Sequence, residues 1–139
     1  MSDDSPPLRS ECPVAASLDL LGDRWTLLIL RDVLIGGVQH FADFAADEQI
    51  APNTLTDRLR RLTAAGLIGR RRDSEDGRRW RYVPLEPAVL LIPVLLDFMV
   101  WGTKHTDGTA PDWLLQAIAS DRDGLIEQLS SVARARRDR

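Results

Sequence analysis

The chain has 139 residues, of which 44% are hydrophobic and 28% are charged, a composition that excludes a disordered chain and fits one folded domain. Residues 1–11 are acidic, polar and contain proline, so we expect a flexible arm there and no signal peptide. The longest apolar run, residues 89–100, is interrupted by Pro93 and Asp97, and it is shorter than the roughly 20 residues of a membrane span. These features predict a cytoplasmic protein without a membrane partner.

The residue types also argue against an enzyme or a metalloprotein. Cys12 is the single cysteine, which excludes a disulfide within the chain and fits a reducing compartment. The two histidines, His40 and His105, do not have the spacing of metal ligands, so we expect no metal and no cofactor. The sequence contains no glycine-rich phosphate loop and no nucleophile–histidine–acid set at a recognisable spacing.

The charge is unevenly distributed along the chain. Residues 57–81 hold nine of the 18 basic residues and only four of the 21 acidic residues, so this segment carries +5. Because the whole chain carries −3, the remainder carries −8. A basic surface on an acidic body is compatible with binding to phosphates, although a solvated charged face would give the same pattern.

The first predicted helices form the start of a core. We expect Pro13 to open a helix that Gly22 ends, with an apolar side of Val14, Ala15, Leu18 and Leu21. Asp23 is a good N-cap for the next helix, residues 24–35. That helix has a wide apolar face, which places it at the centre of the domain.

Residues 41–66 have the pattern of a helix-turn-helix. We expect a short helix at 41–47 with Phe41, Phe44 and Ala45 facing inward, and then a turn. Pro52 suits the first position of a second helix, residues 52–65, in which Leu55, Leu59 and Leu62 share one face and which Gly66 ends. A short helix, a turn and a second helix are the parts of this motif.

A predicted β-hairpin follows directly. Residues 67–72 and 78–85 are extended in character, and the polar residues 73–77 between them form a turn. A hairpin at this place is the wing of a winged helix. The predicted fold class is therefore mainly α with a small β-hairpin (α+β), a winged helix-turn-helix DNA-binding domain with flanking dimerisation helices.

Residues 88–104 form the most apolar predicted helix, which Pro93 should kink or restart. Apolar side chains occur on nearly every side of it, whereas a small domain offers only one core face. We therefore expect a second copy of the chain to cover the other face, as in a homodimer. The predicted interface consists of Leu91, Leu95, Phe98, Met99 and Trp101.

The remaining residues, 106–139, are expected to form a C-terminal helical extension. A linker at 107–111 precedes two predicted helices, 112–119 and 123–137, and the last five residues, largely arginine, should be frayed. Together with the arm at 1–11, this leaves 12–105 as the winged helix-turn-helix domain with its dimerisation helix 88–104.

Several ordered motifs resemble the HxlR-type winged helix-turn-helix family. They are Cys12-Pro13-Val14, LDLLGDRWTLLI at 18–29 with LRDVL at 30–34, Phe41, LTDRLRRL at 55–62, AGLI at 65–68, Arg81-Tyr82 and Trp101-Gly102, so the resemblance covers roughly residues 12–105. It implies a bacterial homodimeric regulator with a recognition helix at 52–65 and a wing at 73–79. Ala51 departs from the family, which often has a Ser or Thr cap there, and His40 stands where a basic residue is common.

The resemblance also makes Cys12 a candidate redox sensor, because some relatives sense oxidants or electrophiles through a cysteine at this position. Its place before Pro13, at a predicted helix start, would favour a lowered thiol pKa. The alternative is a cysteine that packs as a small apolar side chain.

Helical geometry selects the candidate DNA-binding residues. If Leu55 marks the core direction, then Asn53, Asp57, Arg60 and Arg61 point away from the core, with Thr54 and Thr56 on the flanks. We expect Asn53, Thr54 and Asp57 near base edges and the arginines at phosphates, with Arg58 equally suited to a structural salt bridge. The candidate set is Asn53, Thr54, Thr56, Asp57, Arg58, Arg60, Arg61 and, after the hairpin turn, Arg78 and Arg79.

The sequence thus predicts a regulator that binds duplex DNA at an inverted repeat as a homodimer, with redox state or a small effector as possible modulators. An effector, whose identity the sequence does not give, is expected between the 88–104 helix and the extension. The four tryptophans would line such a pocket or belong to the plain core. The alternative function is a winged-helix protein–protein interaction module, which would not need arginines gathered on the second helix and hairpin.

Overall fold

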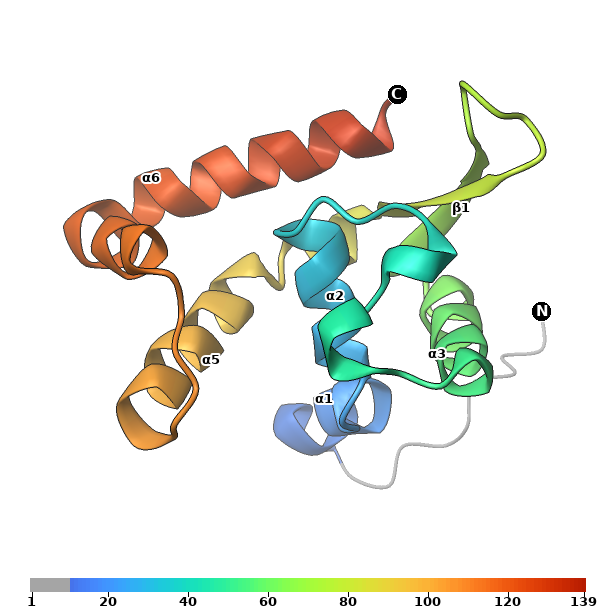
Figure 1. Cartoon of the computed structure of the whole chain (residues 1–139). Helices are drawn as coiled ribbons and strands as arrows, with labels where there is room; N and C mark the ends of the chain where they lie inside the picture. Colours follow the sequence, from blue (N-terminus) through green and yellow to red (C-terminus); the bar gives the residue numbers. More distant parts are fainter. Residues whose placement is uncertain (1–10) are drawn as a thin grey trace.

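The computed structural model describes residues 11–139, so the predicted arm, apart from Glu11, lies outside the described residues. Helices carry most of the described chain, and one two-stranded sheet projects from it (Figure 1). The elements are, in order, α1 (Pro13–Leu21), α2 (Thr26–Leu34), the 3₁₀ turns η1 (Phe41–Asp43) and η2 (Ala46–Glu48), α3 (Pro52–Ala64), β1 (Ile68–Arg72), β2 (Trp80–Pro84), α4 (Glu86–Val89), α5 (Ile92–His105) and α6 (Asp112–Arg137).

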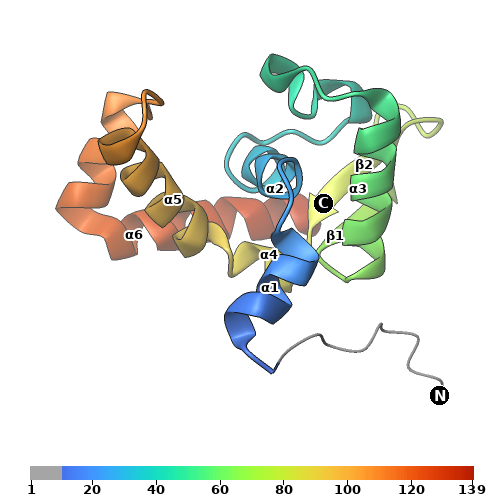
Figure 2. The same cartoon turned by 90° about the horizontal axis from the view of Figure 1, so that it is seen from below.

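Helix α2 is the centre of the fold, as predicted. Figure 2 shows α2 between α3 and the hairpin on one side and α5 with the start of α6 on the other. Its residues Ile29, Leu30 and Leu34 have no exposed surface. The helix begins at Thr26 with Trp25 as its N-cap residue, so the predicted cap Asp23 lies two residues earlier. The Asp23 carboxylate still accepts hydrogen bonds from the backbone N–H of Trp25 (2.8 Å) and of Thr26 (3.0 Å).

The first element of the helix-turn-helix differs from the predicted helix 41–47. It consists of the two 3₁₀ turns, joined by Phe44 and Ala45, and Ala45 has a left-handed backbone with φ of 46°. The Asp32 carboxylate, buried on α2, accepts a hydrogen bond of 2.7 Å from the Ala45 N–H and holds this turn. Phe44 and Ala45 are buried as expected, but Phe41 is 37% exposed. A long-range polar contact therefore overrides the local helical pattern.

The second helix and the hairpin confirm the prediction closely. Leu55, Leu59 and Leu62 of α3 are buried, and Gly66 follows the helix with φ of 77°, a conformation that glycine adopts without strain. β1 and β2 then pair antiparallel, with Arg70 opposite Tyr82 and Arg72 opposite Trp80.

The predicted helix 88–104 is divided in two. The helix is interrupted after α4, and α5 begins with Pro93 in its first turn, as expected of a proline without an N–H. The combined segment Glu86–His105 has 20 residues and a mean hydropathy of 1.5, so its length and composition alone would allow a membrane span. In the fold, Ile92, Leu95 and Leu96 pack into the core of the domain.

The C-terminal extension packs against the winged helix and shares its core through Leu114, Leu125 and Ala133. The two predicted helices are continuous in α6 except at Asp121, where non-helical torsion angles introduce a kink. The prediction of a frayed C-terminus is wrong. The Arg136 guanidinium donates hydrogen bonds of 3.0 Å to the backbone oxygens of Val33 and Leu34, two of the carbonyls that the end of α2 leaves unsatisfied.

Candidate nucleic-acid interface

Helix α3 presents a polar face to solvent. Asn53, Thr56, Arg60 and Arg61 are exposed, as helical geometry predicts, whereas Thr54 is half-buried at the flank. The helix begins at Pro52 without a side-chain cap, because Ala51 has no polar side chain. The N–H groups of the first turn therefore point outward at the positive end of the helix dipole, a favourable place for an anion such as a phosphate.

Arg58 faces the protein more than the solvent. Its Nε lies 3.1 Å from Asp23 Oδ1, and its Nη1 donates to the Asp57 carboxylate, so its side chain is only 21% exposed. The hydrogen bond to Asp23 raises the pKa of Arg58. Partial burial alone would raise the pKa of Asp23, but hydrogen bonds from Thr26, Trp25 and Arg58 outweigh burial and lower it. Arg58 thus ties α3 to the start of α2.

Asp57 is also engaged within the protein. Its carboxylate pairs with Arg58 and lies 3.7 Å from Arg61 Nη1, one helical turn further along α3. The Asp57 side chain is 49% exposed, and that of Arg61 is 55% exposed, so both can still reach a ligand. This pairing orients Arg61 along the outer face of the helix.

One face of the hairpin combines arginines with aromatic rings, which the sequence analysis did not single out. Strand alternation and register place Arg70, Arg72, Trp80 and Tyr82 on the same face. The guanidinium carbons of Arg70 and Arg72 each lie 4.0 Å from the centre of the Trp80 ring, within the range of cation–π contacts. The alternation of residues 68–72 against 80–84 was the signal that could have found them.

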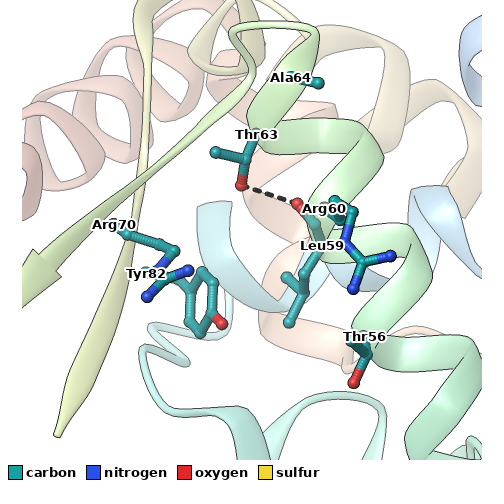
Figure 3. Close-up of a pocket in the computed structure, with 7 residues that line it drawn as sticks. All are labelled: Thr56, Leu59, Arg60, Thr63, Ala64, Arg70 and Tyr82. Atoms are coloured by element: carbon teal, nitrogen blue, oxygen red, sulfur yellow. Dashed lines mark hydrogen bonds between the residues drawn. The ribbon is translucent and has the colours of Figure 1, made fainter.

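A groove of about 350 Å³ runs between α3 and this face of the hairpin (Figure 3). Arg60 reaches it from the helix and Arg70 from the first strand, and none of the described residues that line it is acidic. Thr63 donates its hydroxyl to the Leu59 carbonyl at 2.7 Å, so this threonine lies against its own helix. The remaining lining is Thr56, Leu59, Ala64 and Tyr82.

The base of the wing is anchored to the segment before the helix-turn-helix. His40 Nε2 lies 2.6 Å from Asp73 Oδ2, and the Tyr82 N–H donates to the Gln39 carbonyl at 2.7 Å. The backbone N–H of Glu75 and then the His40 side chain hold the pKa of Asp73 at about 2. His40 therefore ties the start of the hairpin turn to the segment before the helix-turn-helix.

The tip of the wing is open to solvent. Arg78 has a side chain that is 95% exposed and lies 3.6 Å from Asp76, and Arg79 is exposed beside it. The backbone of the turn is closed by the Asp73 N–H, which donates to the Arg79 carbonyl at 3.0 Å. A hydrogen-bonded turn thus carries two arginines without a strong partner among residues 11–139.

The predicted dimer residues lie in different surroundings. Phe98 and Trp101 are 59% and 61% exposed, and Leu91 and Met99 are half-buried. Leu95 is only 5% exposed and packs into the core of its own chain. Cys12 is exposed at the N-terminus of α1, away from these residues in sequence.

A helix-turn-helix with an outward polar face, beside a hairpin rich in arginine, defines the winged helix-turn-helix class of DNA-binding proteins. Residues 20–110 match the model of the HxlR-like helix-turn-helix family, and the chain belongs to this family. Its members in the comparisons are regulators of transcription and not enzymes.

Known relatives agree with this assignment. The uncharacterised HTH-type transcriptional regulator Rv3095 of Mycobacterium tuberculosis is 38% identical over 92 residues, which is 66% of this chain but only 58% of the relative's length. The crystal structure of PA1607, a putative transcription factor, superposes with a TM-score of 0.65 at 33% identity, over 75% of this chain and 70% of the other. The redox regulator HypR in its oxidised form superposes with a TM-score of 0.59 at 29% identity, over 70% of this chain and all of HypR.

Proposed function

We propose that the protein is a homodimeric transcription regulator that binds an inverted-repeat operator in duplex DNA through α3 and the wing. The observation that carries this proposal is the groove between α3 and the hairpin, which receives Arg60 and Arg70 from two elements and has no acidic side chain among the described residues that line it. A DNA backbone that enters the groove would meet both cations while the outer face of α3 lies in the major groove.

The residues divide into readers of bases and binders of phosphate. Asn53, Thr54 and Thr56, in the first turn and a half of α3, are the proposed base contacts, because the N-terminal part of a recognition helix meets base edges. Asp57 adds a possible acceptor for a cytosine amino group. The proposed phosphate ligands are Arg60, Arg61, Arg70, Arg78 and Arg79, whereas the contacts of Arg58 favour a structural role.

Two exposed apolar surfaces support the homodimer. On α5 and the turn before it, Leu90, Val94, Phe98 and Trp101 follow helical spacing and are 40–65% exposed. Helix α1 buries none of its residues, although Val14 and Leu18 of that helix are apolar. Surfaces of this kind favour a partner, and a second copy of the chain is the simplest one. Leu91 and Met99 border the proposed interface, and Leu95 belongs to the core instead.

The dimer and the operator are tested together by selection from a random duplex library. Purified protein should enrich an inverted repeat whose half-sites lie about 34–36 Å apart, one turn of the double helix. Its affinity should fall steeply with salt, because bound arginines release counterions. Weak binding without sequence preference would contradict the proposed operator, and no binding at low salt would favour the protein-interaction function.

We also propose that oxidation of Cys12 modulates DNA binding. Hydrogen bonds from the backbone N–H of Ala15 and then of Val14, at the start of α1, lower the pKa of the Cys12 thiol and so favour the reactive thiolate. In the proposed reaction, the thiols of two protomers and one peroxide form a Cys12–Cys12 disulfide and two waters. HypR, to which this chain is similar, is a redox regulator.

The redox proposal is tested by DNA titration of reduced protein, peroxide-treated protein and the Cys12→Ser variant. Treatment should change the affinity of the native protein and produce a dimer that a reducing agent separates on a denaturing gel. The Cys12→Ser variant should bind DNA equally before and after treatment. Equal DNA binding by all three samples would exclude Cys12 as a sensor.

A further inference from the structure

A second cavity lies on the opposite side of α2 from the DNA-binding groove. It is open to solvent on one side, has a volume of about 720 Å³ and is bordered by α2, α5 and the segment that leads into α6. This volume is within the range of roughly 300–1,000 Å³ that is usual for small-molecule sites. Its walls are mainly apolar, with Leu27, Leu28, Ile35, Phe98 and Met99 among the lining side chains.

The charged groups in the lining neutralise each other. Arg31 and Asp32 both border the cavity, and Arg31 Nη2 lies 2.9 Å from Asp32 Oδ1. The hydroxyl of Thr103 donates to the Met99 carbonyl at 2.7 Å and accepts a hydrogen bond of 3.4 Å from the Ala110 N–H, so its polar group is satisfied within the protein. A charged ligand would lose its hydration without gaining an unpaired counter-charge, so the lining favours an uncharged, apolar molecule. The aromatic rings of Phe98 and Trp113 in the lining favour a molecule that itself contains a ring.

The same ion pair reaches the helix-turn-helix. The second oxygen of Asp32 accepts the hydrogen bond from the Ala45 N–H, and Arg31 Nη1 lies 3.9 Å from Glu48 in the turn before α3. Ala45 and Gln49, on either side of that turn, both have left-handed backbones, which for these residues depend on such tertiary contacts. A molecule that displaces Arg31 or Asp32 would therefore move the start of α3.

We propose that this cavity is the site of an uncharged, ring-containing effector that changes DNA affinity through Arg31 and Asp32. The regulatory half of this proposal rests on the proposed DNA-binding function, whereas the existence of the site does not. The coupling path is short, because the residues that line the cavity are the ones that hold the turn before the recognition helix.

The test uses N-phenyl-1-naphthylamine, a neutral dye whose fluorescence rises in apolar sites, with the full chain. The wild-type protein should bind the dye saturably, with one site per chain. Gly102→Leu should weaken dye binding by tenfold or more, because Gly102 borders the cavity and a Cβ there meets no atom within 4 Å, so the new side chain enters the cavity. Leu28→Trp fills the cavity from α2 and should have the same effect.

Ala119→Leu is the matched control. Ala119 is exposed on α6 and lies outside the cavity lining, so this variant should bind the dye as the wild type does. Equal dye binding by the wild type and both cavity-filling variants would contradict the proposed effector site. Dye binding that appears only when the dimer dissociates on dilution would also overturn it, because a second copy would then occupy the cavity.

The regulatory link is measured with the selected operator. Saturating dye should change the DNA affinity of the wild type by roughly fivefold or more, and DNA should change the dye affinity by the same factor. Glu48→Gln, which lies outside the cavity lining and removes the contact between Arg31 and the turn, should keep dye binding and reduce this coupling. Dye binding without a change in DNA affinity would overturn the regulatory role. A protein that binds the dye but no DNA would instead contradict the proposed DNA-binding function and leave the cavity established.

Discussion

The guanidinium of Arg81, in the second strand of the wing, donates a hydrogen bond of 3.0 Å to the backbone oxygen of Arg136 near the end of α6. Arg81 is only 7% exposed, and it also donates to the backbone oxygen of Arg139. Because the Arg136 side chain bonds the last carbonyls of α2, one helix end holds both the central helix and the wing. The orientation of the wing therefore depends on α6.

Removal of this anchor should destabilise the whole domain. Arg136→Met deletes two charge-assisted hydrogen bonds to buried carbonyls, and we expect the free energy of unfolding to fall by roughly 1.5–3 kcal/mol in urea titrations. Arg139→Ala is the control, because its backbone oxygen still accepts from Arg81. Equal stability of both variants and the wild type would contradict an anchoring role of Arg136.

Substitution of Arg58 should affect mainly stability, whereas substitution of Arg60, only two residues away, should affect mainly DNA binding. Arg58→Met removes the ion pair to Asp23 and should lower the free energy of unfolding by roughly 1–2 kcal/mol. Arg60→Ala should leave stability nearly unchanged and weaken DNA binding with a smaller salt dependence. Urea unfolding and DNA titration at several salt concentrations measure the two effects, and the reverse pattern would refute the division of roles.

The arginines at the tip of the wing should add affinity without selectivity. The double variant Arg78→Ala, Arg79→Ala should weaken binding to all sequences and reduce the slope of log affinity against log salt by roughly one for each lost phosphate contact. Arg122→Ala serves as control, because Arg122 pairs with Asp97 between α6 and α5. An unchanged slope in the double variant would exclude the tip from the interface.

The pairing of α4 with α6 should make stability sensitive to acid. Hydrogen bonds from Arg134 and then Arg137 lower the pKa of Glu86 from 4.5 to about 2. Because this folded-state pKa is depressed, the stabilisation is complete above pH 4.5 and is lost as the pH falls towards 2. Glu86→Gln should therefore unfold more easily than the wild type at pH 7, and the difference in Tm should shrink between pH 4.5 and 2. A difference that does not vary with pH would contradict this assignment.

The sequence was most informative where local rules decide the structure. The helix from Pro52, its end at Gly66 and the following hairpin depend on periodicity and on glycine and proline chemistry, and the structure confirms them. The exposed positions of Asn53, Thr56, Arg60 and Arg61 follow from the same helical geometry.

The sequence was least informative where contacts join residues far apart along the chain. The helix predicted at 41–47 becomes two 3₁₀ turns because Asp32, on another helix, bonds to Ala45. The arginine-rich sequence at the end of α6 predicts a frayed terminus. In the structure the backbone oxygens of Val33 and Leu34 accept hydrogen bonds from the Arg136 guanidinium and hold this end in place. Likewise, the sequence does not show that Asp23 lies beside Arg58, and this contact favours the structural of the two functions that the sequence left open for Arg58.

The anchor of the wing also limits how this regulator can be re-engineered. The family model ends at residue 110, whereas the carbonyl that accepts from Arg81 belongs to Arg136. A chimera that exchanged only the family region would separate Arg81 from the end of α6. The buried Arg81 guanidinium would then lose its acceptor, or the end of α6 would pack against a strand without this arginine. Transplanting the proposed DNA-binding surface of this protein therefore requires that the hairpin and the end of α6 be moved as one unit.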